Sequence, residues 1–71
     1  MEANRSPFPT ISLAAARVNA RLTQKELADR CGVSESTVNA WETGKRLPNL
    51  KMLASIESAV GISLDYIRFP Y

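Results

Sequence analysis

Short apolar stretches at helical spacing alternate along the chain with polar residues that end them. The first stretch predicts a helix from about residue 11 to residue 20, with Thr10 as its N-cap. Leu13, Ala16 and Ala20 recur at helical intervals and therefore lie on one face of this helix. We expect that face to turn toward the core.

Capping residues mark both ends of a second, shorter helix. Thr23 and Glu26 have the spacing of a capping box, in which each side chain satisfies a free backbone N–H at a helix start. The second helix is therefore predicted to start at Gln24. Gly32 is predicted to end it, because glycine adopts the left-handed conformation at the lowest cost.

A third helix follows almost at once. Ser34 is its predicted N-cap, the helix covers about residues 35–43, and Gly44 ends it. Val38 and Trp41 lie on one face of this helix, so we interpret Trp41 as a core residue.

The last part of the chain predicts two more helices. Asn49 caps a fourth helix that ends at Gly61, with a buried stripe of Leu50, Leu53, Ile56 and Val60. Ser63 caps a short fifth helix that carries Leu64 and Ile67, and Pro70 closes it.

These elements predict an all-α fold, a compact five-helix domain over residues 10–71. Residues 1–9 contain Pro7 and Pro9, which prevent a regular helix and predict an extended N-terminal arm. A chain of 71 residues holds one domain at most.

Composition limits the chemistry that this domain can perform. There is no histidine and Cys31 is the only cysteine, which excludes intramolecular disulfides, zinc fingers and histidine acid–base catalysis. No nucleophile–base pair, phosphate-binding glycine loop or metal cluster can be assembled. We therefore expect no enzyme activity, cofactor, metal or small-molecule ligand, and interpret Cys31 as a small buried apolar residue.

Charge and hydropathy favour a protein of the cytoplasm with an anionic partner. The net charge is +2 and the pI is about 9.0, which favours such a partner. No apolar run approaches the roughly 20 residues needed to cross a bilayer, and the lone cysteine fits a reducing compartment.

Two short helices joined by Gly32, Val33 and Ser34 form the pattern of a helix-turn-helix. The turn has to hold the second helix away from the body, because the major groove is just wide enough for one α-helix. The outer face of this helix is made of small polar residues and Ala40: Glu35, Ser36, Thr37, Asn39, Ala40 and Thr43.

Longer motifs surround this pattern. They are Leu-Thr-Gln-Lys-Glu-Leu-Ala at residues 22–28, Gly-Val-Ser at 32–34, Val38, and Trp-Glu-Thr-Gly-Lys-Arg-Leu-Pro at 41–48. In this order and spacing, the chain resembles the phage repressor and Cro family of helix-turn-helix domains, also called the XRE family, over about residues 10–68. The resemblance implies a lambda-repressor-like fold and a sequence-specific regulator of transcription that reads double-stranded operator DNA with residues 35–43.

The resemblance also assigns roles to single positions. Arg17 and Glu42 correspond to an arginine and a glutamate that form a buried ion pair. Gln24 corresponds to a glutamine that touches the DNA backbone and braces the recognition helix. The positions that correspond to base-reading residues are Glu35, Ser36, Asn39 and Ala40. Those that correspond to DNA-backbone contacts are Thr23, Gln24, Thr37, Thr43, Lys45 and Arg46.

Several of these residues have a second interpretation. Glu35 departs from the commoner family pattern, and it either complements the helix dipole or accepts a hydrogen bond from a cytosine amino group. If Gln24 does not contact DNA, it is an exposed residue at a helix start. If Lys45 and Arg46 do not contact phosphates, they are solvated cations in a loop. If Arg17 does not form the ion pair, it is a surface cation.

The apolar and aromatic residues at the end of the chain predict a protein partner. We expect a homodimer whose two copies meet through the fifth helix and residues 67–71, where Tyr66, Ile67, Phe69 and Tyr71 crowd together. Such a dimer is expected to bind two DNA half-sites about 34 Å apart. In the alternative to this dimer, Phe69 and Tyr71 fold back onto the first helix and the arm around Phe8 and complete the core of a monomer.

A different function is also compatible with the sequence. In this alternative the domain is an antitoxin or anti-regulator that acts mainly by binding another protein.

Overall fold

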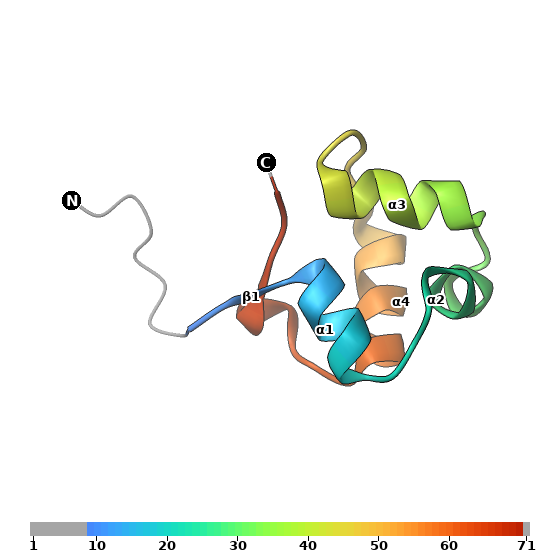
Figure 1. Cartoon of the computed structure of the whole chain (residues 1–71). Helices are drawn as coiled ribbons and strands as arrows, with labels where there is room; N and C mark the ends of the chain where they lie inside the picture. Colours follow the sequence, from blue (N-terminus) through green and yellow to red (C-terminus); the bar gives the residue numbers. More distant parts are fainter. Residues whose placement is uncertain (1–8, 71) are drawn as a thin grey trace.

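Four α-helices and a very short β-ladder make up residues 9–70, the part of the chain that this computed structural model describes. The elements are β1 (Ile11–Ser12), α1 (Leu13–Asn19), α2 (Gln24–Cys31), α3 (Glu35–Thr43), α4 (Leu50–Val60), a 3-10 turn η1 (Leu64–Tyr66) and β2 (Ile67–Arg68). Figure 1 shows α3 lying across one end of α4, with α2 seen nearly end-on beside them. The architecture is mainly helical, as the sequence predicts.

One cluster of apolar side chains holds the helices together. α4 contacts α1 and α2, and α2 also contacts α3. The largest fully buried side chains are Trp41, Leu13, Leu27, Ile56 and Val38. Burial of each of these side chains contributes about 1.5–3 kcal/mol. Trp41 therefore belongs to the core, as its alignment with Val38 predicts.

The first helix begins later than the sequence predicts. Ser12, not Thr10, is the N-cap, and its hydroxyl accepts a hydrogen bond from the backbone N–H of Ala15 at 3.0 Å. The reason is a tertiary contact, because β1 pairs in parallel with β2 and Ile11 lies opposite Ile67. Residues in a ladder are extended, so the helix can start only at Leu13.

The predicted fifth α-helix is absent from the described residues. Ser63 does cap the segment, but only the 3-10 turn η1 forms, and the chain then enters β2. Ile67 is buried as a strand residue, not as a helical one. The five-helix count is therefore wrong, because pairing with β1 draws the chain into an extended conformation.

The buried stripe of α4 is shorter than predicted. Ile56 and Val60 are buried and Leu53 is partly buried, but the Leu50 side chain is 85% exposed. Leu50 is the first residue of α4 and follows Leu47, which is 67% exposed. The three-to-four spacing correctly predicts which face of α4 turns inward. It does not show how far along α4 the neighbouring helices cover that face.

The C-terminal segment packs against its own domain. Ile67 is buried, and Phe69 packs against the core from a partly buried position. An added Cβ at Gly44, whose φ is 81°, would lie 2.5 Å from the carbonyl oxygen of Pro70. Ile67 and Phe69 therefore bury apolar surface within their own domain, which leaves less of it for the predicted C-terminal dimer contact. Tyr71 and the arm residues 1–8, including Phe8, lie outside the described residues.

Gly44→Ala is expected to lower the free energy of unfolding by more than Gly32→Ala does. Both glycines have positive φ, so alanine costs about 1–2 kcal/mol at either position. At Gly44 the new methyl group also meets Pro70, and overpacking adds about 1–3 kcal/mol. At Gly32 an added Cβ meets nothing within 4 Å, which makes it the matched control. Chemical denaturation measures both losses, and equal losses would contradict the packing of Pro70 on Gly44.

Candidate nucleic-acid interface

The turn between α2 and α3 is built from backbone hydrogen bonds around one left-handed residue. Gly32 has a φ of 71°, and the N–H of Val33 donates to the carbonyl of Ala28 at 3.0 Å, which closes α2. Ser34 then starts α3 by accepting a hydrogen bond from the N–H of Thr37 at 3.2 Å. The two helices are thus joined by the tight turn that the sequence predicts.

The two faces of α3 differ in polarity. Val38 and Trp41 are buried on the inner face. The predicted base-reading residues lie on the outer face, where Glu35, Ser36 and Asn39 are exposed and Ala40 is half-buried. The outer face therefore presents short side chains that permit a second molecule to approach the helix closely.

An ion pair joins α1 to the end of α3. Arg17 Nε lies 2.6 Å from Glu42 Oε2, and Arg17 Nη2 lies 3.4 Å from Glu42 Oε1. The two side chains are 15% and 6% exposed, so this is a largely buried pair, as the resemblance implies. Arg17 Nη1 also donates to the carbonyl of Leu22 at 2.8 Å. The guanidinium group thus connects three parts of the chain.

Gln24 extends this network to the outer face of α3. Its Nε2 donates to Glu42 Oε1 at 2.9 Å and to Asn39 Oδ1 at 3.3 Å. A primary amide has two hydrogens, and both are used here. The family resemblance implies that Gln24 braces the recognition helix, but neither it nor the sequence indicates the link to Asn39.

The N-terminus of α2 carries the predicted capping box. Thr23 Oγ1 accepts from the N–H of Glu26 at 3.0 Å, and the Thr23 N–H donates to Glu26 Oε1 at 2.8 Å. This donation from the Thr23 backbone lowers the pKa of Glu26 below its ordinary value. Helix geometry leaves the N–H groups of Gln24 and Lys25 without intrahelical partners, so this end of α2 can donate to an anion.

Two cations follow α3. Lys45 and Arg46 are exposed, and the backbone N–H of Lys45 is fixed by a 2.9 Å hydrogen bond to the carbonyl of Ala40. Neither side chain forms a salt bridge with another residue between 9 and 70. Their charges are therefore available to an outside partner.

The hydroxyl groups of the predicted DNA-contacting residues on α3 already have partners in α3 or at its N-cap, Ser34. Thr43 Oγ1 donates to the carbonyl of Asn39 at 2.9 Å, and Thr37 Oγ1 lies 2.9 Å from Ser34 Oγ. Ser36 Oγ lies 3.0 Å from the same Ser34 oxygen. The one hydrogen of the Thr43 hydroxyl is donated to Asn39, so Thr43 has to break this bond before it can donate to a phosphate. The hydroxyl groups of Ser34, Ser36 and Thr37 have three hydrogens for two contacts, which leaves one for a phosphate or a base.

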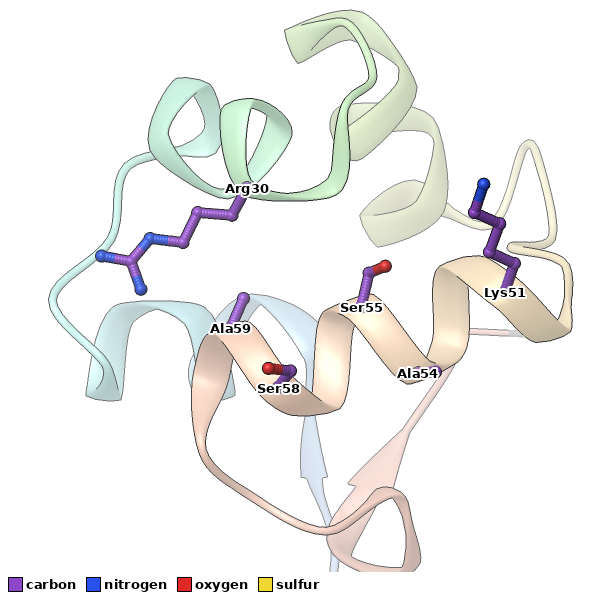
Figure 2. A pocket seen from close by; sticks show the side chains of 6 residues that line it. All are labelled: Arg30, Lys51, Ala54, Ser55, Ser58 and Ala59. Carbon is purple, nitrogen blue, oxygen red and sulfur yellow. The ribbon is translucent and has the colours of Figure 1, made fainter.

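A second feature, which the sequence does not predict, is a shallow hollow between α2 and α4. Figure 2 shows Arg30 reaching over Ala59 from α2, and Lys51 near the opposite end of α4. Two small hydroxyl residues, Ser55 and Ser58, also line the hollow. None of the predicted DNA-contacting residues lines it.

Between residues 9 and 70, no group of three or more His, Cys, Asp or Glu side chains is placed to hold a metal ion. Cys31 is buried, and this burial raises the pKa of its thiol. None of the helices described is long and apolar enough to cross a membrane.

Comparison with known families agrees with this geometry. The family model described as Helix-turn-helix matches residues 13–67, which contain all four α-helices. The chain belongs to the XRE family of helix-turn-helix domains. No solved structure matches it at a significant level.

Several curated proteins are similar to this XRE-family domain. Multiprotein-bridging factor 1 of Candida albicans is 41% identical over 69% of this chain and 32% of its own length. The Uncharacterized HTH-type transcriptional regulator YqaE of Bacillus subtilis is 36% identical over 79% of this chain and 48% of its own length. The HTH-type transcriptional activator BcrR of Enterococcus faecalis is 35% identical over 69% of this chain and 24% of its own length. The chain thus spans less than half the length of these relatives.

Glu42→Ala is expected to lower the free energy of unfolding of this XRE-family domain by about 3–5 kcal/mol. The substitution leaves the Arg17 guanidinium largely buried without its counter-charge. Lys25→Ala is the control, because Lys25 and Asp29 form an exposed pair at 3.7 Å that is worth less than about 1 kcal/mol. Thermal and denaturant unfolding measure both variants. An unchanged melting temperature in Glu42→Ala would show that the ion pair does not stabilise the fold.

Proposed function

We propose that this domain is a sequence-specific regulator of transcription that binds double-stranded DNA with α3 in the major groove. The observation that carries the proposal is the outer face of α3, with short side chains and exposed polar groups, on a helix fixed by a tight turn and a buried ion pair. A major groove admits one α-helix, and short polar side chains can reach the base edges. We further propose that it acts in the manner of phage repressors and Cro, in the cytoplasm and on the nucleoid.

Two sets of residues have different roles in this proposal. The residues that meet base edges are Glu35, Ser36, Asn39 and Ala40. The residues that meet the sugar–phosphate backbone are Thr23, Gln24, Thr37, Thr43, Lys45 and Arg46. Gln24 makes its contact through the backbone N–H at the start of α2, because both hydrogens of its side-chain amide are used within the protein.

Electrostatics support a contact of this kind on the side of α3. Lys45 and Arg46 form no salt bridge within residues 9–70, so they can neutralise phosphates and release counterions. The net charge of the whole chain is only +2. A single copy therefore binds weakly, and affinity depends strongly on salt concentration.

We propose that two copies bind together to raise this affinity. A homodimer with two-fold symmetry reads two half-sites about one helical turn apart, or about 34 Å. The C-terminal contact proposed for the dimer is reduced by the packing of Ile67 and Phe69 on their own core. Ile11, in β1, and Tyr66, just before β2, remain 38% and 40% exposed, and they form the proposed contact.

Lys45→Ala and Arg46→Ala are expected to weaken binding to all DNA sequences alike. Each removes about one unit from the slope of log affinity against log salt concentration, because one phosphate contact is lost. Asn39→Ala is expected to change which bases are preferred. Affinity measured over a range of salt concentrations, on operator and non-operator DNA, separates the two effects.

Arg30→Ala is the matched control for this experiment, since it removes one exposed positive charge in the hollow between α2 and α4. Its salt slope is expected to stay close to that of the parent. If Lys45→Ala altered preference at a single base position and kept the salt slope, phosphate contact by Lys45 would be disproved. Lack of binding to any DNA would reject the proposed function itself.

Tyr66→Ser is expected to weaken self-association and the cooperativity of operator binding together. The serine removes apolar surface next to the β-ladder and leaves the side chains of α3 unchanged. Val18→Ser is the control, because Val18 is 62% exposed on α1 and lies outside the proposed contact. Sedimentation velocity at high concentration measures the association. A full chain that stays monomeric and also binds without cooperativity would exclude the dimer.

A further inference from the structure

The hollow between α2 and α4 has a positive charge near each end. Arg30 reaches over Ala59, and Lys51 lies eight positions before Ala59 on α4. An α-helix rises about 1.5 Å per residue, so Lys51 and Ala59 are roughly 12 Å apart along the helix axis. The two cations therefore bracket about two turns of α4. None of the described residues that line the hollow is acidic.

These two charges are not neutralised by their own domain. Arg30 and Lys51 are exposed, and neither side chain forms a salt bridge or a hydrogen bond with another residue between 9 and 70. Glu26 lies one turn before Arg30 on α2, but its Oε1 already accepts the backbone N–H of Thr23. Complementary charge therefore favours an acidic partner for the hollow.

The floor of the hollow is made of small side chains. They are Ala54, Ser55, Ser58 and Ala59, all on α4. The distance between two packed helices depends on the side chains at their contact, and small ones permit the closest approach. A second helix can therefore lie along α4 between the two cations.

An exposed leucine lies beside the hollow. Leu50 precedes Ala54 by four positions on α4, and residues at that spacing are neighbours on one helix face. Its side chain is 85% exposed, the highest value among the large hydrophobic residues that the structure describes. A partner that covers Leu50 gains apolar contact, which the phosphate backbone of a nucleic acid does not offer. The combination of free cations and exposed leucine favours a protein partner over a second DNA contact.

We propose that the hollow between α2 and α4 docks an acidic amphipathic helix of another protein. Two carboxylates of this helix, about two turns apart, meet Arg30 and Lys51, and an apolar side chain covers Leu50. None of the predicted DNA-contacting residues lines the hollow, so it stays open when α3 lies on DNA. The domain then brings a second protein to the site that it binds, which goes beyond the proposed function.

The test selects ligands for the full chain from a library of displayed random peptides. The peptides have about 16 residues, which is long enough to form a helix. The selected peptides are expected to carry more Asp and Glu than the library, with two acids about seven or eight positions apart. They are then synthesised, and fluorescence anisotropy measures their affinity for the parent and for variants of the hollow.

Two variants remove the features on which the proposal stands. Arg30→Ala combined with Lys51→Ala is expected to weaken peptide binding about tenfold, since each exposed ion pair contributes up to about fivefold. Leu50→Ser is expected to weaken it about tenfold as well, because apolar contact is lost. All three side chains are exposed, so the melting temperature is expected to stay near that of the parent.

Each variant has a matched control outside the hollow. Lys25→Ala combined with Lys45→Ala removes the same total charge and is expected to keep the affinity for the peptides. Val18→Ser removes an apolar side chain that is 62% exposed on α1, and it is expected to keep that affinity too.

The possible results separate this proposal from its rivals. The proposal is overturned if no peptide is selected, if the selected peptides are not enriched in acids, or if the hollow variants bind them as tightly as the parent does. It is also overturned if the hollow variants keep the peptides but lose operator affinity or self-association, because DNA or a second copy then occupies the hollow. A parent that binds acidic peptides but no DNA would reject the proposed function and leave the docking site standing.

Discussion

The position of α3 depends on one largely buried guanidinium group. Arg17 donates from α1 to the carboxylate of Glu42 on α3, and from its third nitrogen to the carbonyl of Leu22, in the segment that leads into α2. The apolar core resists separation of the helices, but apolar contact has little directional preference. A bidentate arginine–carboxylate pair has a fixed geometry, so it sets the rotation of α3 as well as its distance. This rotation decides which side chains face outward.

Local signals predicted the boundaries of the central helices from the sequence. The starts of α2, α3 and α4 are set by Thr23, Ser34 and Asn49, and in each the side-chain oxygen accepts a backbone N–H three residues later. Such caps work within one helical turn, so a single sequence contains the whole interaction. The outward position of Asn39 follows in the same way from the period of α3, since Val38 and Trp41 turn inward.

Contacts between distant parts of the chain could not be predicted in this way. Nothing near Thr10 or Ile67 indicates that residues 11–12 and 67–68 form a ladder, and this ladder moved the start of α1 and replaced the fifth helix. The link from Gln24 to Asn39 likewise depends on how two helices are placed side by side. The ion pair of Arg17 with Glu42 was anticipated only through resemblance to a known family. Helix propensity and the hydrophobic period predict that a helix or strand forms, but they do not predict which other parts of the chain it contacts.

The β-ladder also has a consequence for the order in which the protein folds. Arg68 Nη1 donates to the carbonyl and the hydroxyl of Thr10 across 58 positions of sequence, so these contacts enclose nearly the whole domain. Closing a loop of that length costs chain entropy that two residue pairs cannot repay alone. The helices can form and pack first, because their own hydrogen bonds are local and the segments that connect them are short. The ladder then joins ends that the packed helices have already brought together, and Ile67 completes the buried cluster when it does so.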